Sequence, residues 1–136
     1  MKLYGYFRSS AAYRIRLVLN LKGLDYEQKF VNLQKGENLQ SGYLEINPHG
    51  KVPTLVNGDD VLTQSMAIAE YIEELYPSPA LMPKSPADRA RVRALCQIVA
   101  CDIHPINNVP VLNYLVNQMM LSEDDKLRWY RHWVAK

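Results

Sequence analysis

The stretch FRSSAAYRIRLVLNLKG, residues 7–23, decides how the first part of the chain folds. It follows a short apolar run at residues 2–6 that is typical of a buried strand, and it opens an amphipathic helix. Gly23 comes directly after the last periodic position, where helices commonly end. The apolar positions of this helix recur at helical spacing: Ala12, Ile15, Val18 and Leu19. Ser9 and Ser10 stand at the helix start, where serines act either as plain caps or as donors to a bound anion.

The pattern directly after this helix predicts a second strand. Residues 25–33 alternate between apolar and polar side chains. So short a strand–helix–strand order implies a parallel pair with a right-handed crossover. Residues 34–42 are polar and predict a loop, and residues 43–50 predict a short helical turn.

A β-hairpin and a second long helix are expected next. The hairpin strands lie at 54–56 and 61–63, and Asn57-Gly58 is a strong turn signal between them. Ser65 is expected to cap the helix that follows. One face of that helix is apolar: Ile68, Tyr71, Ile72 and Leu75.

The proline-rich segment at residues 76–86 predicts a domain boundary, because four of its eleven residues are proline. We expect one domain at 1–77, a linker at 78–86 and helices over 87–136. An apolar stripe after the boundary predicts a core or dimer face: Val92, Leu95, Cys96, Val99, Ala100 and Ile103. Pro105 and Pro110 are expected to interrupt this helix. A last helix is predicted from Ser122 and is still helical at Lys136.

Composition excludes several classes of protein. The 136 residues carry a formal net charge of +2 with no basic run, so neither a nucleic-acid partner nor a membrane partner is expected. No secretory signal or apolar membrane span is evident, which predicts a cytoplasmic protein. Cys96 and Cys101 do not share a helix face, and we expect two reduced thiols buried in a core.

The element order of the first half is that of a thioredoxin-like α/β domain, and the second half is all-α. Such folds place a reactive group at the N-terminus of the first helix, where the dipole stabilises a thiolate. Redox members carry two cysteines there, whereas this chain has Ser-Ser-Ala-Ala at 9–12. A dithiol mechanism is therefore excluded at this place, and a thiolate bound there would belong to a ligand.

The whole chain resembles the zeta class of glutathione transferases. The matching segments are YFRSSAAYRIR at 6–16, NLKGLDYE at 20–27, NPHGKVPTL at 47–55, QSMAIAEYIEE at 64–74, YPSPALMP at 76–83 and CDIHPINN at 101–108. The resemblance implies the two-domain glutathione transferase architecture, glutathione as cofactor and a homodimer. Ala11 stands where the class signature usually has cysteine, so the essential thiol is expected to be that of glutathione. The family's helical domain is longer than the one in this sequence, and we expect the intact protein to be the active species.

The resemblance also implies a role for each residue of the first helix start. Ser9 would donate a hydrogen bond to the glutathione sulfur, with Ser10 and the amides around Ala11 as further donors, while a plain N-cap is the structural alternative for Ser9. Arg8 is expected to bind the substrate's carboxylate or ketone oxygens. Arg14 is expected to support the site. Arg16 also flanks the serines, and an exposed or structural ion pair is its structural alternative.

Further glutathione contacts are implied along the chain. Val52 would pair its backbone with the cysteinyl part next to a cis Pro53. The γ-glutamyl carboxylate would lie at Gln64 and Ser65. The glycyl end is expected near Asn38 and Lys51, for which solvated surface is nearly as plausible. His104 and Asn108 would lie across the cleft near the tripeptide. The spacing of His104 from Cys101 and Asp102 fits no standard zinc site, so no metal is expected.

The resemblance implies a glutathione-dependent cis–trans isomerase that converts maleylacetoacetate to fumarylacetoacetate in tyrosine and phenylalanine breakdown. Val109 and Pro110 carry no charge, so a relative that uses arginines at this place to bind a compact diacid would be poorly matched. This favours maleylacetoacetate over the more compact maleylpyruvate. A maleylpyruvate isomerase, a general glutathione transferase or peroxidase, and a non-enzymatic glutathione-binding module remain alternatives, since a fold does not fix a function.

Overall fold

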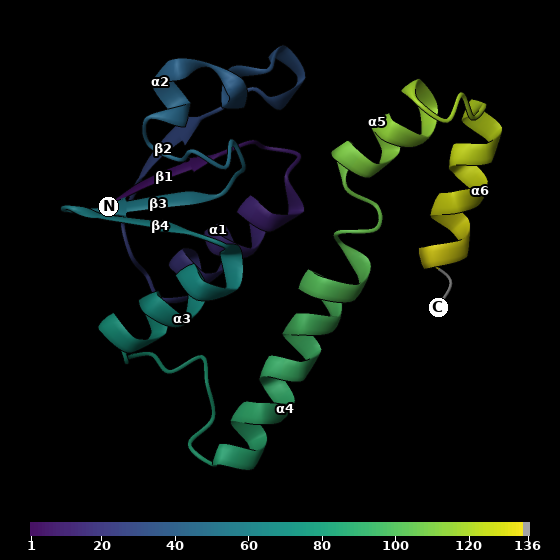
Figure 1. The fold of residues 1–136 in the computed structure, drawn as a ribbon. Coiled ribbons are helices and arrows are strands. Elements are labelled where there is room, and N and C mark those ends of the chain that lie inside the picture. The colour runs from purple at the N-terminus through teal and green to yellow at the C-terminus, as the bar shows by residue number, and fades with distance from the viewer. Residues whose placement is uncertain (135–136) are drawn as a thin grey trace. The chain divides into compact units, whose positions relative to one another are not determined.

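The computed structural model describes residues 1–134 and divides the chain into two compact units, Met1–Pro83 and Lys84–Lys136. The first unit is built on a four-stranded mixed sheet (Figure 1). Its strands are β1 (Lys2–Gly5), β2 (Glu27–Phe30), β3 (Thr54–Asn57) and β4 (Asp60–Thr63), in the order β2-β1-β3-β4. β1 and β2 are parallel, whereas β3 runs antiparallel to both β1 and β4. The predicted parallel pair, the hairpin and the thioredoxin-like fold class are therefore confirmed.

The core of the first unit lies between the sheet and two helices. These helices are α1 (Ser10–Leu21) and α3 (Ser65–Leu75), and they pack together on one face of the sheet (Figure 1). The fully buried side chains of this core come from both layers: Leu3, Ile15, Leu19, Leu55, Ile68 and Ile72. Each contributes roughly 1.5–3 kcal/mol through burial, so these positions fix both helices to the sheet.

The hairpin turn and the start of α3 each differ by one residue from the sequence prediction. Asn57 pairs with Asp60, so the turn centres on Gly58 and Asp59. Gly58 has a φ of +60°, which suits glycine at the first central position of a two-residue turn. The N-cap of α3 is Gln64, so the prediction that Ser65 caps this helix is wrong: the chain bends at Gln64, and Ser65 is already helical.

The segment from 33 to 44 is more ordered than the predicted loop over 34–42. It forms two 3₁₀ turns, η1 (Leu33–Lys35) and η2 (Glu37–Leu39), followed by α2 (Ser41–Leu44). Asn32 Oδ1 caps the first turn, accepting from the backbone amides of Gln34 at 3.0 Å and Lys35 at 3.2 Å. Glu37 Oε2 in turn accepts from the Asn32 amide at 2.6 Å. These side chains supply the partners that a loop backbone would otherwise find in water.

A buried lysine fastens the proline-rich segment to the first unit. The side chain of Lys22, at the end of α1, is fully buried, and its Nζ lies 2.5 Å from Glu73 Oε2. The same Nζ donates to the carbonyl oxygens of Tyr76 at 2.6 Å and Pro79 at 2.7 Å. Glu73 also accepts from the amides of residues 81 and 82. The chain therefore stays tied to the first unit almost to its end at Pro83.

The second unit is helical. Its helices are α4 (Pro86–Gln97), the π-helical segment η3 (Ile98–Ile103), α5 (Val109–Asn117) and α6 (Glu123–Val134). The interruption predicted from Pro105 and Pro110 is confirmed, because a turn separates η3 from α5. Ser122 begins α6 with a reciprocal cap, its Oγ accepting from the Asp125 amide at 3.2 Å. The predicted helix at residues 135–136 lies outside the described residues.

The apolar stripe of the second unit lies at its surface. Leu95 is 60% exposed and Val99 46% exposed, and none of the residues of α4 or η3 is buried. Cys96 is half-buried and Cys101 is exposed, so the expectation of two buried thiols is wrong; the two residues are not joined in a disulfide. The stripe is thus not a core face among the described residues, and its role as a dimer face stays a prediction. Across residues 1–134, no helix is both long and apolar enough to cross a membrane.

Candidate glutathione site

Three segments of the predicted site leave the same edge of the sheet. Tyr4 of β1 lies beside Thr54 of β3, and Thr54 lies beside Thr63 of β4. Because β3 is antiparallel to its neighbours, this row is the end of β1, the start of β3 and the end of β4. The chain therefore brings residues 6–10, 51–53 and 64–65 to one edge. Both α1 and α3 also begin there (Figure 1).

Ser9 is the N-cap of α1. Its Oγ accepts a hydrogen bond from the Ala12 amide at 3.2 Å, while its own amide donates to the Tyr6 carbonyl at 3.0 Å. A hydroxyl that accepts through a lone pair keeps its proton for donation. The capping role and a donor role toward an anion are therefore compatible at Ser9. Ser10 follows as the first helical residue and is exposed, whereas Ala11 is buried.

The three arginines near the serines differ in their surroundings. Arg16 donates from Nη1 to the Tyr6 carbonyl at 3.5 Å and from Nη2 to the Phe7 carbonyl at 3.3 Å. It thus fixes the turn between β1 and α1 through two backbone carbonyl oxygens. Arg14 is half-buried in the second turn of α1, which suits a supporting role. Arg8 is exposed in the turn itself, where its guanidinium is open to a ligand.

The segment carrying Val52 is held by a closed ring of hydrogen bonds. The Val52–Pro53 peptide bond is cis, as the resemblance implied. On either side of it, the Lys51 carbonyl and the Thr54 hydroxyl each contact Tyr43 Oη, at 2.7 and 2.8 Å. Asn47 Nδ2 donates to the same two oxygens, at 2.8 and 3.0 Å.

Sequence reasoning missed Tyr43 and Asn47. Asn47 lies in the NPHGKVPTL segment, where an asparagine before a proline signals a turn, and its Oδ1 accepts from the His49 amide at 3.0 Å. No local signal marks Tyr43, because its partners lie eight and eleven residues further along the chain. Burial raises the pKa of the Tyr43 hydroxyl above its ordinary value, although its hydrogen bond with Thr54 acts in the opposite direction.

Asn38 and Lys51, the predicted neighbours of the glycyl end, are placed differently from each other. Asn38 Nδ2 donates to the Gly50 carbonyl at 2.8 Å, so this amide ties η2 to the loop before β3. Gly50 has a φ of +59°, and a Cβ on it would lie 3.0 Å from the Asn38 carbonyl oxygen. Lys51 has an exposed side chain. Asn38 is therefore a structural residue of the loop, and Lys51 is the more accessible of the two.

Gln64 and Ser65 form an unusual helix start. Gln64 has a φ of 66° and a ψ of 112°, a conformation that is strained for a residue with a side chain. Gln64 is the N-cap of α3, but in the part of the chain that the structure describes its side chain makes no capping hydrogen bond to the helix. The first backbone amides of α3 therefore keep their capacity to bind an anion. Ser65 is buried, with 7% of its surface exposed. Strain of this kind persists where the surroundings impose it, and it often marks a binding site.

His104 and Asn108 belong to the second unit. His104 ends the π-helical segment, and Asn108 caps α5, its Oδ1 accepting from the Val109 amide at 2.8 Å. Their place beside the bound tripeptide stays a prediction.

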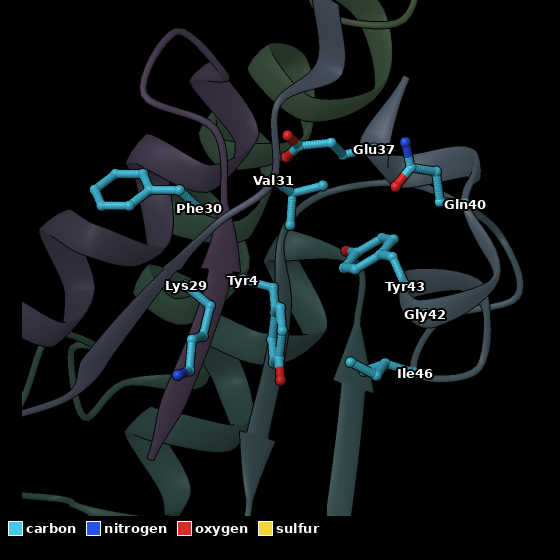
Figure 2. Close-up of a pocket in the computed structure, with 9 residues that line it drawn as sticks. All are labelled: Tyr4, Lys29, Phe30, Val31, Glu37, Gln40, Gly42, Tyr43 and Ile46. Atoms are coloured by element: carbon cyan, nitrogen blue, oxygen red, sulfur yellow. The ribbon is translucent and has the colours of Figure 1, made fainter. Parts of the chain in front are cut away.

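A pocket of about 330 Å³ lies on the face of the sheet opposite α1 and α3, and Figure 2 shows its lining residues. Its lining residues come from β1, β2 and the segment around α2: Tyr4, Lys29, Phe30, Val31, Glu37, Gln40, Gly42, Tyr43 and Ile46. Tyr4 points to this face because Leu3, its neighbour on β1, points into the core. Two lining residues connect the pocket with the sheet edge: Tyr4 lies beside Thr54 in the row that ends the strands, and the Tyr43 hydroxyl supports the Val52 segment. The candidate site is an edge with two helix N-termini, and the pocket adjoins it through these two residues.

Comparison with known proteins identifies the family of this chain. Residues 1–74 match the model of the glutathione S-transferase N-terminal domain. A maleylacetoacetate isomerase of Pseudomonas aeruginosa is 49% identical over all of this chain and 65% of its own length. A holo structure of a zeta-class bacterial maleylpyruvate isomerase is 47% identical, with a TM-score of 0.96 over 99% of this chain and 64% of that one.

A further solved structure is that of a maleylacetoacetate isomerase of Methylobacterium extorquens with bound malonate and glutathione. It is 44% identical, with a TM-score of 0.93 over 97% of this chain and 62% of that one. The chain thus spans a little under two thirds of the length of these relatives. Their identity and coverage, together with the fold, show that this chain belongs to the zeta class of the glutathione S-transferase family.

Proposed function

We propose that the sheet edge binds glutathione and that the protein is a glutathione-dependent cis–trans isomerase acting on maleylacetoacetate. The observation that carries the proposal is the convergence of Ser9, the Val52 backbone and the uncapped start of α3 on one edge. The Ser9 hydroxyl suits a thiolate, the Val52 backbone suits a peptide backbone, and the start of α3 suits a carboxylate. Glutathione carries all three of these groups. The names of the relatives, isomerases of maleylacetoacetate and maleylpyruvate, support the reaction.

When bound, glutathione supplies a thiolate that adds to the cis double bond beside a carbonyl and leaves again after rotation. The task of Ser9 is to hold that sulfur as a thiolate by donating its hydroxyl proton in a hydrogen bond. One such charge-assisted bond is worth roughly 1.5–3 kcal/mol, or about one to two pKa units of the thiol. The N-terminus of α1 adds a favourable field for the negative sulfur.

The remaining groups hold the tripeptide and the substrate. The Val52 amide and carbonyl pair with the cysteinyl backbone in the manner of an added strand. The amides at the start of α3 and the Ser65 hydroxyl bind the γ-glutamyl carboxylate. Arg8, exposed beside the serines, binds a carboxylate or ketone oxygen of the substrate.

An assay of purified protein with maleylacetoacetate, with and without glutathione, tests the proposal. We expect conversion that requires glutathione and leaves its amount unchanged when the free thiol is titrated at the end. A stoichiometric loss of glutathione would instead support a transferase of the same class. Absence of conversion with intact glutathione binding would favour the non-enzymatic module, in which Ser9→Ala leaves function intact.

We further propose that the protein acts as a cytoplasmic homodimer. The spacing of Cys96 and Cys101, which do not share a helix face, fits unpaired thiols in a reducing compartment. The exposed apolar stripe on α4 and η3, from Leu95 to Ile103, fits a self-association face. Light scattering after size-exclusion chromatography tests the dimer, and a monomer at micromolar concentration would contradict it.

A further inference from the structure

We propose that Tyr43, Asn47 and Thr54 are positioning residues that set the affinity for glutathione by fixing the Val52 backbone. This inference rests on the proposed glutathione site and names the groups that preorganise its central strand-like contact. None of the three residues needs to touch the thiol, so they are expected to act on binding and not on the ionisation of the sulfur.

The hydrogen bonds around Val52 form a ring in which only one assignment of donors and acceptors is possible. The Lys51 carbonyl can only accept, so the single proton of Tyr43 Oη must be donated to it. Tyr43 Oη then accepts from the Thr54 hydroxyl, whose oxygen accepts in turn from Asn47 Nδ2. The second proton of Asn47 Nδ2 returns to the Lys51 carbonyl and closes the ring. Every donor in the ring is used once.

The ring is shielded from water. The exposed fraction is 0% for Thr54, 1% for Asn47 and 6% for Tyr43. Water therefore cannot replace a partner that is removed, and the loss of one hydroxyl leaves two buried polar groups short of a bond. Burial also raises the pKa of Tyr43, so its phenol stays protonated and keeps donating.

The two anchors of the ring lie on either side of the residue that glutathione would contact. Lys51 precedes Val52, and Thr54 follows the Val52–Pro53 pair, so both ends of this short segment are fixed to α2 and to Asn47. A backbone already fixed in its binding conformation does not have to be ordered when the ligand binds, which improves affinity. The ring thus links buried side chains to a ligand that they do not contact.

The test compares variants of the full chain by calorimetric titration with reduced glutathione. We expect Tyr43→Phe and Thr54→Val to weaken binding by about three- to tenfold, the range expected for one buried hydrogen bond. Thr54→Ser keeps the hydroxyl and is expected to bind within about twofold of the original chain. The isosteric Thr54→Val change gives the same comparison should Tyr43→Phe fail to fold.

Tyr71→Phe is the matched control. The Tyr71 hydroxyl also has two partners, accepting from Asn57 Nδ2 at 2.9 Å and donating to Asp60 Oδ2 at 3.2 Å. It lies at the hairpin turn, at the opposite end of β3 from Thr54. We expect this variant to lose some thermal stability but to bind glutathione like the original chain.

The pKa of the bound thiol, followed by its ultraviolet absorbance, should be unchanged in Tyr43→Phe.

Three results would overturn the inference. One is unchanged binding in Tyr43→Phe and Thr54→Val, with the original chain binding glutathione; the site would then stand without its positioning residues. Another is an equal loss of binding in Tyr71→Phe, which would make the effect one of general stability. In the third, the original chain does not bind glutathione at all, and the proposed function fails together with the inference.

Discussion

Replacing Lys22 by methionine is expected to destabilise the first unit strongly. The change leaves Glu73 without the ammonium 2.5 Å away and leaves two carbonyls without their donor. Breaking a buried ion pair on one side typically costs about 3–5 kcal/mol. Because the Glu73 side chain retains 12% exposure, water partly compensates it, and we expect a value near the lower end of that range.

The expected loss is large enough to measure by calorimetry. For a domain of this size, 1 kcal/mol shifts the melting temperature by roughly 4–8 °C, so a loss of about 3 kcal/mol gives a decrease of about 12–24 °C. Hydrogen exchange at the amides of Leu81 and Met82, which donate to Glu73, should accelerate in parallel. The double variant Lys22→Met/Glu73→Gln should recover part of the loss, because it removes the uncompensated charge and keeps an acceptor for both amides.

The exposed pair of Lys29 and Glu27 is the matched control. Its nitrogen–oxygen distance is also 2.5 Å, but its side chains are 42% and 53% exposed. Lys29→Met should therefore leave the melting temperature nearly unchanged, since exposed pairs contribute little. The reasoning is refuted if Lys22→Met and Lys29→Met lower the melting temperature equally, or if Lys22→Met lowers it by only a degree or two.

Three further predictions concern single groups of the first unit. Burial opposes ionisation of Glu73, but Lys22 and two backbone amides outweigh it and hold the Glu73 pKa below 4.5. The stability that the Glu73 carboxylate contributes should be complete above about pH 4.5 and should be lost as the pH falls through the lower, folded-state pKa. Glu73→Gln should therefore flatten the acid denaturation curve in that window. An unchanged curve would contradict this. Ser9→Ala should cost about 1 kcal/mol as a lost cap and raise the pKa of the bound glutathione thiol by about one to two units, measured by ultraviolet titration; an unshifted thiol would remove Ser9 as the donor. Gly50→Ala should destabilise the fold, since its φ is +59° and the new Cβ would meet the Asn38 carbonyl at 3.0 Å, whereas Gly42→Ala, with nothing within 4 Å, should be tolerated in the same thermal melt.

Local sequence patterns predicted most helices and strands of the first unit, because these elements depend on residues that are close in sequence. The periodicity of α1, the glycine after it and the hairpin signal at Asn57-Gly58 depend on residues close in sequence. Errors of one residue arose where the backbone conformation decides a boundary, as at the strained Gln64. The order in residues 33–44 was missed because side-chain caps from Asn32 and Glu37 replace solvent there.

The long-range contacts of the first unit depend on pairings that no local pattern reveals. The bonds of Lys22 to the carbonyls of Tyr76 and Pro79 join residues 54 and 57 positions apart. A lysine near a helix end is ordinarily read as solvent-exposed, so its burial emerges only when the chain folds back on α1. The ring on the Lys51 carbonyl likewise requires that α2 lie against the start of β3. The roles of Ser9 and Val52 were reached by resemblance, because a capping serine and a loop proline have ordinary explanations of their own.

The order of groups along the sheet edge predicts which part of glutathione carries the binding energy. Ser9 follows β1, Val52 precedes β3 and Ser65 follows β4, and these strands are neighbours in that order. With strands about 4.8 Å apart, the two ends of this row are separated by about 10 Å, a span that γ-glutamylcysteine can bridge in an extended conformation. The glycyl end is expected near Lys51, which is exposed, and near Asn38, whose amide is already bonded to Gly50. We therefore expect γ-glutamylcysteine to keep most of the affinity of glutathione in calorimetric titration and cysteinylglycine to lose most of it. Tighter binding of cysteinylglycine than of γ-glutamylcysteine would show that the start of α3 is not the carboxylate site.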